Sequence, residues 1–155
     1  MIEFVLIFPM LLIFALAIAE FGFMLHANIT VNSAAREGAR FAAVANLPSD
    51  PPLTCDAGSI EKRTVDSSTG LLQCSEVTVG YIEQTGDAVY GRGDEVVVNI
   101  DHTYTSKTPL GDLLNALSFG AIPSTVQVRA CADARLEVPP IDQGVLAPGS
   151  GDCGS

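Results

Sequence analysis

This chain has no lysine or arginine before Arg36, although the stretch that precedes it is strongly apolar. A secretory signal peptide requires a positively charged n-region and a cleavage site of small residues, and neither pattern is visible here. The first charge in the chain is instead the acidic Glu3, at the mouth of the apolar run. The start of the chain therefore needs an explanation other than an ordinary secretory signal.

Basic residues are scarce along the whole chain. There are 8 lysines and arginines against 18 aspartates and glutamates, which gives a formal net charge of −10. Binding to nucleic acid requires basic patches that neutralise phosphate. We therefore expect no nucleic-acid partner.

No CxxC pair is present among the four cysteines, which argues against a zinc site. An even number of cysteines beside an export-type N-terminus is typical of two disulfides formed in an oxidising compartment. Three pairings are possible, and the sequence alone leaves them open. We favour Cys55–Cys74 and Cys131–Cys153, because each pair closes a modest local loop.

Catalytic patterns are also missing. Nothing resembles a nucleophile elbow or a catalytic pair of known spacing, and the histidines lie in no ligand constellation. We expect no enzyme activity, no cofactor and no metal. The tripeptide Arg92-Gly93-Asp94 spells an integrin-binding motif, but such a tripeptide arises easily by chance in a glycine-rich turn, so we expect no adhesion through it.

The long apolar run is the main feature that is present. Glu20 is its only charged residue between Phe4 and Leu25, and the length is about that needed to cross roughly 30 Å of hydrocarbon. We predict one helix from residue 3 to 46, with a transmembrane or filament-core half at 1–27 and an amphipathic half at 28–47. Prolines at 48, 51 and 52 end it.

The amphipathic half carries small residues at helical spacing, which permit close packing of helices. The predicted packing residues are Ala35, Gly38, Ala39, Ala42 and Ala43.

We predict a globular head at residues 48–137. Asp56 or Ser59 caps a short helix that ends at about Ser67. Alternating β-branched stretches at 75–84, 95–106 and 124–138 predict three strands of a small antiparallel sheet, and 108–119 a short amphipathic helix or loop. The expected fold is α+β, with the sheet packed on the outer half of the long helix. The tail at 138–155 is rich in Pro and Gly, but Cys153 indicates that it is tied down.

The opening resembles the TadE-like pilins of tight-adherence pili, a family related to type IV pilins. The pieces that carry the resemblance come in family order: Glu3-Phe4, Ile7-Phe8-Pro9, Glu20-Phe21-Gly22 and Asn32 to Arg40. The head adds weaker similarity: a strand, the stretch from Thr108 to Leu117, and a last strand that ends in Arg135-Leu136-Glu137. The resemblance therefore covers about residues 3–137.

The resemblance implies roles for four residues in assembly: Glu3, Phe4, Pro9 and Glu20. Pilins lose a basic leader to a prepilin peptidase, which explains the missing n-region, although the glutamate then usually sits fifth and here is third. A carboxylate in hydrocarbon is costly unless paired, so Glu3 is expected to meet the N-terminal ammonium of a neighbouring subunit. Glu20 either pairs with a neighbour's arginine or amide or snorkels to the membrane surface. Pro9 is a weak point of the helix or a tolerated membrane proline.

The resemblance also implies a function. The chain is expected to be a structural subunit that waits in the cytoplasmic membrane as a single-pass protein and then joins an extracellular filament that adheres to surfaces. Its partners are copies of itself or other pilins, the prepilin peptidase and the pilus assembly machinery. TadE-like proteins are usually minor pilins, but a major subunit is equally compatible with this sequence. The alternative is a membrane component of a pilus or secretion machine that does not polymerise.

Overall fold

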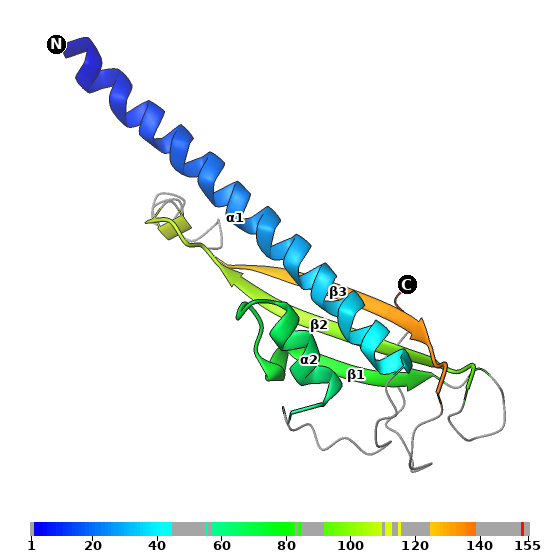
Figure 1. The fold of residues 1–155 in the computed structure, drawn as a ribbon. Helices are drawn as coiled ribbons and strands as arrows, with labels where there is room; N and C mark the ends of the chain where they lie inside the picture. Colours follow the sequence, from blue (N-terminus) through cyan, green and yellow to red (C-terminus); the bar gives the residue numbers. More distant parts are fainter. Residues whose placement is uncertain are drawn as a thin grey trace. The chain divides into compact units, whose positions relative to one another are not determined.

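The computed structural model of the chain begins with one long helix, α1 (Ile2–Val44). It has 43 residues and is about 65 Å long at the standard rise of 1.5 Å per residue. Figure 1 shows it as a single continuous helix, and it continues through Pro9 without interruption. The predicted end at 46 lies outside the described residues, which are 2–44, 55, 57–82, 84, 92–109, 111–112, 115, 125–138 and 153.

The chain divides into two compact units. The first unit comprises residues 1–29 and 103–128, and the second comprises residues 30–102 and 129–155. α1 and two of the strands contribute residues to both units.

The second helix, α2 (Ile60–Ser67), is capped by Ser59, one of the two residues predicted for this role. The Ser59 side chain accepts a hydrogen bond from the Lys62 N–H at 3.1 Å, which satisfies one of the free amides of the first turn. The helix ends where Thr69 and Gly70 take positive φ angles of 54° and 87°. Gly70 adopts this left-handed conformation without steric cost, which makes it an ordinary helix stop.

A single turn of 3-10 helix, η1 (Cys74–Glu76), leads into the sheet. The sheet contains β1 (Val77–Ile82), β2 (Glu95–Thr105) and β3 (Thr125–Arg135) in the order β1-β2-β3. β1 and β2 are antiparallel, with register from Val77 opposite Ile100 to Ile82 opposite Glu95. The α+β fold class predicted from the sequence is confirmed.

The core of the second unit lies between the outer part of α1, α2 and the sheet. Val31, Ala34 and Ala35 of α1 are fully buried, as are Val96, Val97 and Val98 of β2. Simple alternation predicts Val96, Val98, Ile100 and His102 on one buried face. Val97 is buried as well, so burial along β2 does not follow simple alternation.

The chain that follows β3 closes this unit. Gly93 donates its N–H to the Leu136 carbonyl at 2.9 Å, and Leu136 donates to the Asp94 carbonyl at 2.8 Å. Glu137 donates its N–H to the Ala43 carbonyl at 2.9 Å, which satisfies one of the free acceptors at the end of α1.

Two predicted features fall mainly outside the described residues. Pro109, Gly111, Asp112 and Asn115 are helical, but the leucines of the expected amphipathic stretch are not among the described residues. Of the tail, only Val138 and Cys153 are described. The division into 1–27, 28–47, 48–137 and 138–155 stays a prediction.

Candidate assembly and anchoring site

The first part of α1 exposes almost all of its large apolar side chains. Between Phe4 and Ile18 every large apolar side chain except Leu16 is exposed, from 46% at Leu12 to 77% at Leu6. By length and composition the helix is able to cross a membrane. A soluble monomer rarely exposes a contiguous apolar patch of more than a few hundred Å². We infer that apolar surroundings from outside the chain, lipid or protein, cover this segment.

The predicted assembly residues near the start all lie on this exposed segment. Glu3 is exposed in the first turn of α1, where the helix dipole favours a negative charge. The rings of Phe4 and Phe8, one turn apart, lie 5.7 Å from centroid to centroid. Their contacts with neighbouring subunits are not visible in a single chain, so the assembly roles of Glu3, Phe4 and Pro9 stay predictions.

Glu20, the second acidic residue of the apolar run, is bound by its own chain. Its Oε1 accepts hydrogen bonds from the Tyr104 hydroxyl at 2.8 Å and from the Lys107 N–H at 3.2 Å. Its Oε2 accepts one from the Thr108 N–H at 2.9 Å, and the Thr108 side chain adds another. Each carboxylate oxygen therefore has at least one donor, all within the first unit.

The segment that binds Glu20 follows the end of β2. The Lys107 and Thr108 amides come just before Pro109, where the chain becomes helical. Amides at the start of a helical segment have no acceptor within the helix and favour an anion. Thr108 and Pro109 belong to the weaker part of the TadE-like resemblance, and this was the only sequence signal for their role.

Sequence reasoning missed these partners of Glu20. The expected partners were a neighbour's arginine or amide, or headgroups reached by snorkelling. The structure shows a third arrangement, in which backbone amides and a hydroxyl of the same chain donate hydrogen bonds to Glu20. A role for Glu20 between subunits stays a prediction.

The hydroxyl of Tyr104 is held in its neutral form. Burial raises the pKa of Tyr104 to about 12, and the hydrogen bond to Glu20 and its negative charge act in the same direction. Only 5% of Tyr104 is exposed. The hydroxyl therefore remains a donor to Glu20 over the whole physiological pH range.

The small-residue face of α1 is buried within the chain. Ala35, Ala39 and Ala42 are at most 2% exposed, and Ala43 is 7% exposed. A methyl group added at Gly38 would overlap the Thr64 hydroxyl of α2 and would lie 3.5 Å from Val98 Cγ1 of β2. The small residues thus let α2 and β2 of the same chain approach α1 closely. A role of this face in packing between the helices of different subunits stays a prediction.

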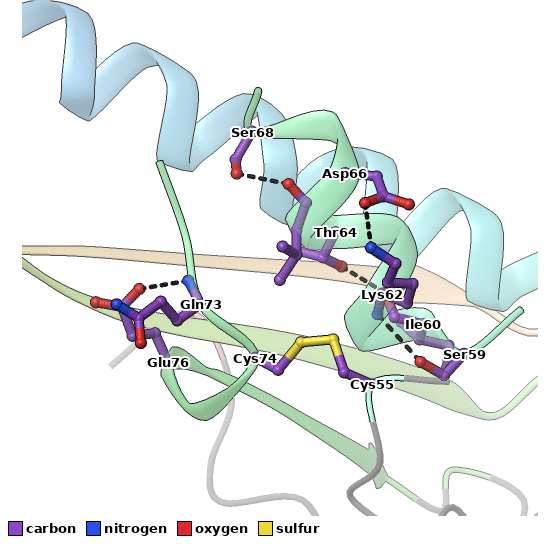
Figure 2. The surroundings of a disulfide bond; sticks show 11 residues. Cys55, Ser59, Ile60, Lys62, Thr64, Asp66, Ser68, Gln73, Cys74 and Glu76 are labelled. Atoms are coloured by element: carbon purple, nitrogen blue, oxygen red, sulfur yellow. Dashed lines mark hydrogen bonds and ion pairs between the residues drawn. A yellow bond between two sulfur atoms is a disulfide. The ribbon is translucent and has the colours of Figure 1, made fainter. Parts of the chain in front are cut away.

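Both disulfides join the pairs that short loops favour: Cys55–Cys74 and Cys131–Cys153. Figure 2 shows the first bond beside α2, with Cys55 before the helix and Cys74 after it. The second ties Cys153 of the tail to the middle of β3. A loop of this length stabilises the folded state by roughly 3 kcal/mol in the chain-entropy account.

The Arg92-Gly93-Asp94 tripeptide is part of the closure of the head. Asp94 is fully buried and accepts a hydrogen bond from the Gln84 N–H at 2.9 Å. Arg92 donates its Nε–H to the Glu137 carbonyl at 2.8 Å. A receptor that reads the aspartate of such a motif has no access to it here.

Among the residues that the structure describes, no group of three or more His, Cys, Asp or Glu side chains is placed to hold a metal ion. His102 Nδ1 lies 2.9 Å from Glu76 Oε1, and Glu76 Oε2 also accepts a hydrogen bond from the Gln73 N–H. This pair links β2 to the turn that precedes β1.

Residues 1–40 match the family described as TadE-like protein. The match confirms the resemblance over the apolar run and the small-residue segment up to Arg40, and it indicates a pilus-associated protein with an N-terminal apolar helix. No curated protein and no solved structure matches the chain. A filament subunit and a component of the assembly machinery both fit this pattern.

Proposed function

We propose that the chain is a pilin-type structural subunit, anchored in the cytoplasmic membrane by the first part of α1 and assembled through that segment into an extracellular pilus. The observation that carries the proposal is the contrast between the two parts of α1. Apart from Leu16, the large apolar side chains from Phe4 to Ile18 are exposed, while small residues from Ala34 to Ala43 are buried. The later part of α1 is thus packed within its own chain, while the apolar surface at its start has no such cover.

The exposed apolar part of α1 suits both environments that a pilin occupies, the membrane and the filament. Burial of apolar surface is worth roughly 25 cal/mol per Å², whether lipid or protein covers it. Lipid tails are as apolar as leucine, so the exchange of lipid for neighbouring helices has little hydrophobic driving force of its own. Specific contacts must then favour the filament over the membrane.

Glu3 is the group best suited to supply such a contact. It is the first charged residue of the segment and is exposed. Within a bundle of apolar helices an unpaired carboxylate costs several kcal/mol, and an ammonium from a neighbouring subunit removes that cost in one register only. The pairing therefore favours one axial offset between neighbouring subunits of the filament.

The head is suited to the outer surface of a filament. It is closed by two disulfides, and the chain carries a net charge of −10. Disulfides compensate for a small core in an oxidising environment. The partners in this proposal are copies of the chain or other pilins, the prepilin peptidase and the assembly machinery, and the filament serves surface adhesion.

A second function rests on the same exposed segment. A single-pass component of a pilus or secretion machine exposes an identical helix to lipid and never polymerises. The two functions differ in where the protein accumulates, because only a filament subunit leaves the membrane.

The experiment is to shear cells, image the released material by electron microscopy and identify its proteins by mass spectrometry. Filaments built mainly of this chain support a major subunit, and filaments of another pilin with this chain as a trace support a minor one. Complete absence from sheared filaments, with the chain retained in membranes, contradicts the proposal and supports the second function.

A further inference from the structure

We propose that the lipid-covered part of α1 ends at Glu20, and that Glu20 with its bonded segment 104–108 forms a collar at the membrane surface. The inference rests on the membrane anchoring in the proposed function but not on polymerisation. It differs from a boundary drawn on hydrophobicity, since the apolar run continues past Glu20 to Leu25.

Placing the collar in hydrocarbon would be costly. Glu20 is half-buried and binds the Tyr104 hydroxyl and the backbone amides of Lys107 and Thr108. To carry Glu20 into the bilayer, the chain would have to carry this irregular segment with it. Lipid-exposed irregular backbone does not occur within the hydrocarbon region, because its polar groups find no partners there.

Moving Glu20 into lipid alone, without the segment that binds it, would be costly as well. The carboxylate would then lose every one of these hydrogen bonds, and the two amides would lose their acceptor. A charged residue at the centre of a bilayer costs several kcal/mol even before such losses. The collar is therefore most stable where water and headgroups reach it.

The collar carries a residue that is typical of the membrane interface. Lys107 is exposed, and a long lysine side chain reaches the headgroups from such a position. Tyr104, only 5% exposed, contributes by holding Glu20.

The length of the uncharged stretch of α1 also fits a boundary at Glu20. Glu3 and Glu20 are the acidic residues that bracket the uncharged stretch of α1, and they lie about 26 Å apart along the helix axis. A hydrocarbon core is roughly 30 Å thick, and a slightly shorter span is accommodated by local thinning of the bilayer at modest cost. Both carboxylates thus reach an interface when the stretch between them spans the membrane.

The test uses the absence of tryptophan from the chain, which makes a single introduced tryptophan a unique probe. The full chain is reconstituted in phospholipid vesicles as Phe14→Trp or as Phe23→Trp, on either side of Glu20. Quenching by lipids brominated at different acyl depths then gives the depth of each indole. We expect Phe14→Trp to lie deep and Phe23→Trp at the headgroup level, with about 13 Å of helix axis between them.

A second variant tests the role of Glu20 itself. Adding Glu20→Leu to Phe23→Trp should move the indole deeper, because the collar loses its anchor and the apolar run becomes continuous. Glu37→Leu in the same background is the matched control, since it removes a glutamate of α1 far from the apolar run, and it should leave the depth unchanged. Absence of free thiols in each variant shows that both disulfides have formed.

The outcomes separate the inference from the proposed function. If Phe23→Trp lies as deep as Phe14→Trp, or if Glu20→Leu does not change its depth, the collar is wrong while anchoring stands. If neither tryptophan is quenched by any lipid, the chain does not insert, and the anchoring in the proposed function fails together with the collar.

Discussion

Tyr104 donates a hydrogen bond of 2.8 Å to Glu20, a residue 84 positions earlier in the chain. This bond connects the end of β2 to the apolar helix within one unit. It gives the charged residue of the apolar run a partner inside its own subunit. Several measurable properties depend on it or on the packing of the neighbouring head.

Tyr104→Phe removes the hydroxyl donor and keeps the buried ring. We expect a loss of about 1.5 kcal/mol of unfolding free energy in detergent, at the low end for a bond to a charged group because Glu20 is only half-buried. A double-mutant cycle with Glu20→Gln measures the coupling directly. Strictly additive effects of the two substitutions would show that the bond contributes nothing.

Two of the three tyrosines should titrate late. Burial raises the pKa of Tyr104 to about 12, and burial together with the charge of Glu61 raises the pKa of Tyr81 to about 12, from an ordinary value of 10.0. Because the folded state holds these protons more tightly than the unfolded state, their stabilisation is complete below pH 10 and is lost as the pH rises to about 12.

Tyrosinate absorbance is a clean measurement here, since the chain has no tryptophan. We expect the native protein to titrate well above the urea-unfolded protein. A native curve that coincides with the unfolded curve near pH 10 would show that neither hydroxyl is protected.

Gly38→Ala should strain the contact between α1 and α2. The added methyl group would overlap the Thr64 hydroxyl, so we expect a loss of roughly 1–3 kcal/mol of stability. Gly22→Ala is the matched control on the same helix, because nothing lies within 4 Å of its added methyl group. It should stabilise the helix by up to about 1 kcal/mol.

Thr64→Ala should partly rescue Gly38→Ala by removing the hydroxyl that is overlapped. Denaturant unfolding of the unsubstituted protein, Gly38→Ala, Gly22→Ala and the double variant Gly38→Ala/Thr64→Ala measures both effects. Equal stability of Gly38→Ala and Gly22→Ala would contradict the packing described here.

Non-reducing peptide mapping should recover two linked peptide pairs, Cys55–Cys74 and Cys131–Cys153, and no free thiol. Replacing Cys131 and Cys153 together by serine should cost roughly 3 kcal/mol, since it releases the loop between β3 and the tail. Labelling of Cys153 by a thiol reagent in the native protein would contradict the second bond.

Glu3→Ala should reduce sheared filament at least about tenfold while the chain stays in the membrane, because one lost ion pair of about 1.4 kcal/mol suffices for that change. Glu37→Ala is the control. It removes another glutamate of α1, whose partner Arg63 lies in the head at 2.9 Å, and should leave filament yield unchanged. Wild-type filament yield for Glu3→Ala would sink the proposed pairing with a neighbouring ammonium.

Local patterns in the sequence predict much of this structure. The apolar run and the following small residues define α1 almost to its ends, Ser59 marks the start of α2, and alternation places all three strands. Short loops favour the two disulfides that the structure contains. These features depend on neighbours in sequence, on periodicity or on loop length.

The missed features depend on tertiary contacts between distant residues. Nothing near Glu20 in sequence indicates that Tyr104 and Thr108 bind it. The burial of Val97 does not follow from alternation along β2, and Asp94 is enclosed where the chain after β3 bonds back to its carbonyl. The small-residue stripe predicts close packing, but the sequence alone does not say that Thr64 of the same chain is the group that approaches Gly38.

The central claim is that the exposed apolar part of α1 contacts other pilin subunits in a filament, and in-cell photocrosslinking tests it most directly. A photoreactive amino acid replaces Phe14, which is 61% exposed, and in a control it replaces Val44, 60% exposed at the far end of α1. The account predicts crosslinks from position 14 to copies of this chain or to another pilin, present in sheared filaments and lost with Glu3→Ala. Crosslinks from position 14 to lipid or to machinery proteins alone, with none in sheared material, would contradict it.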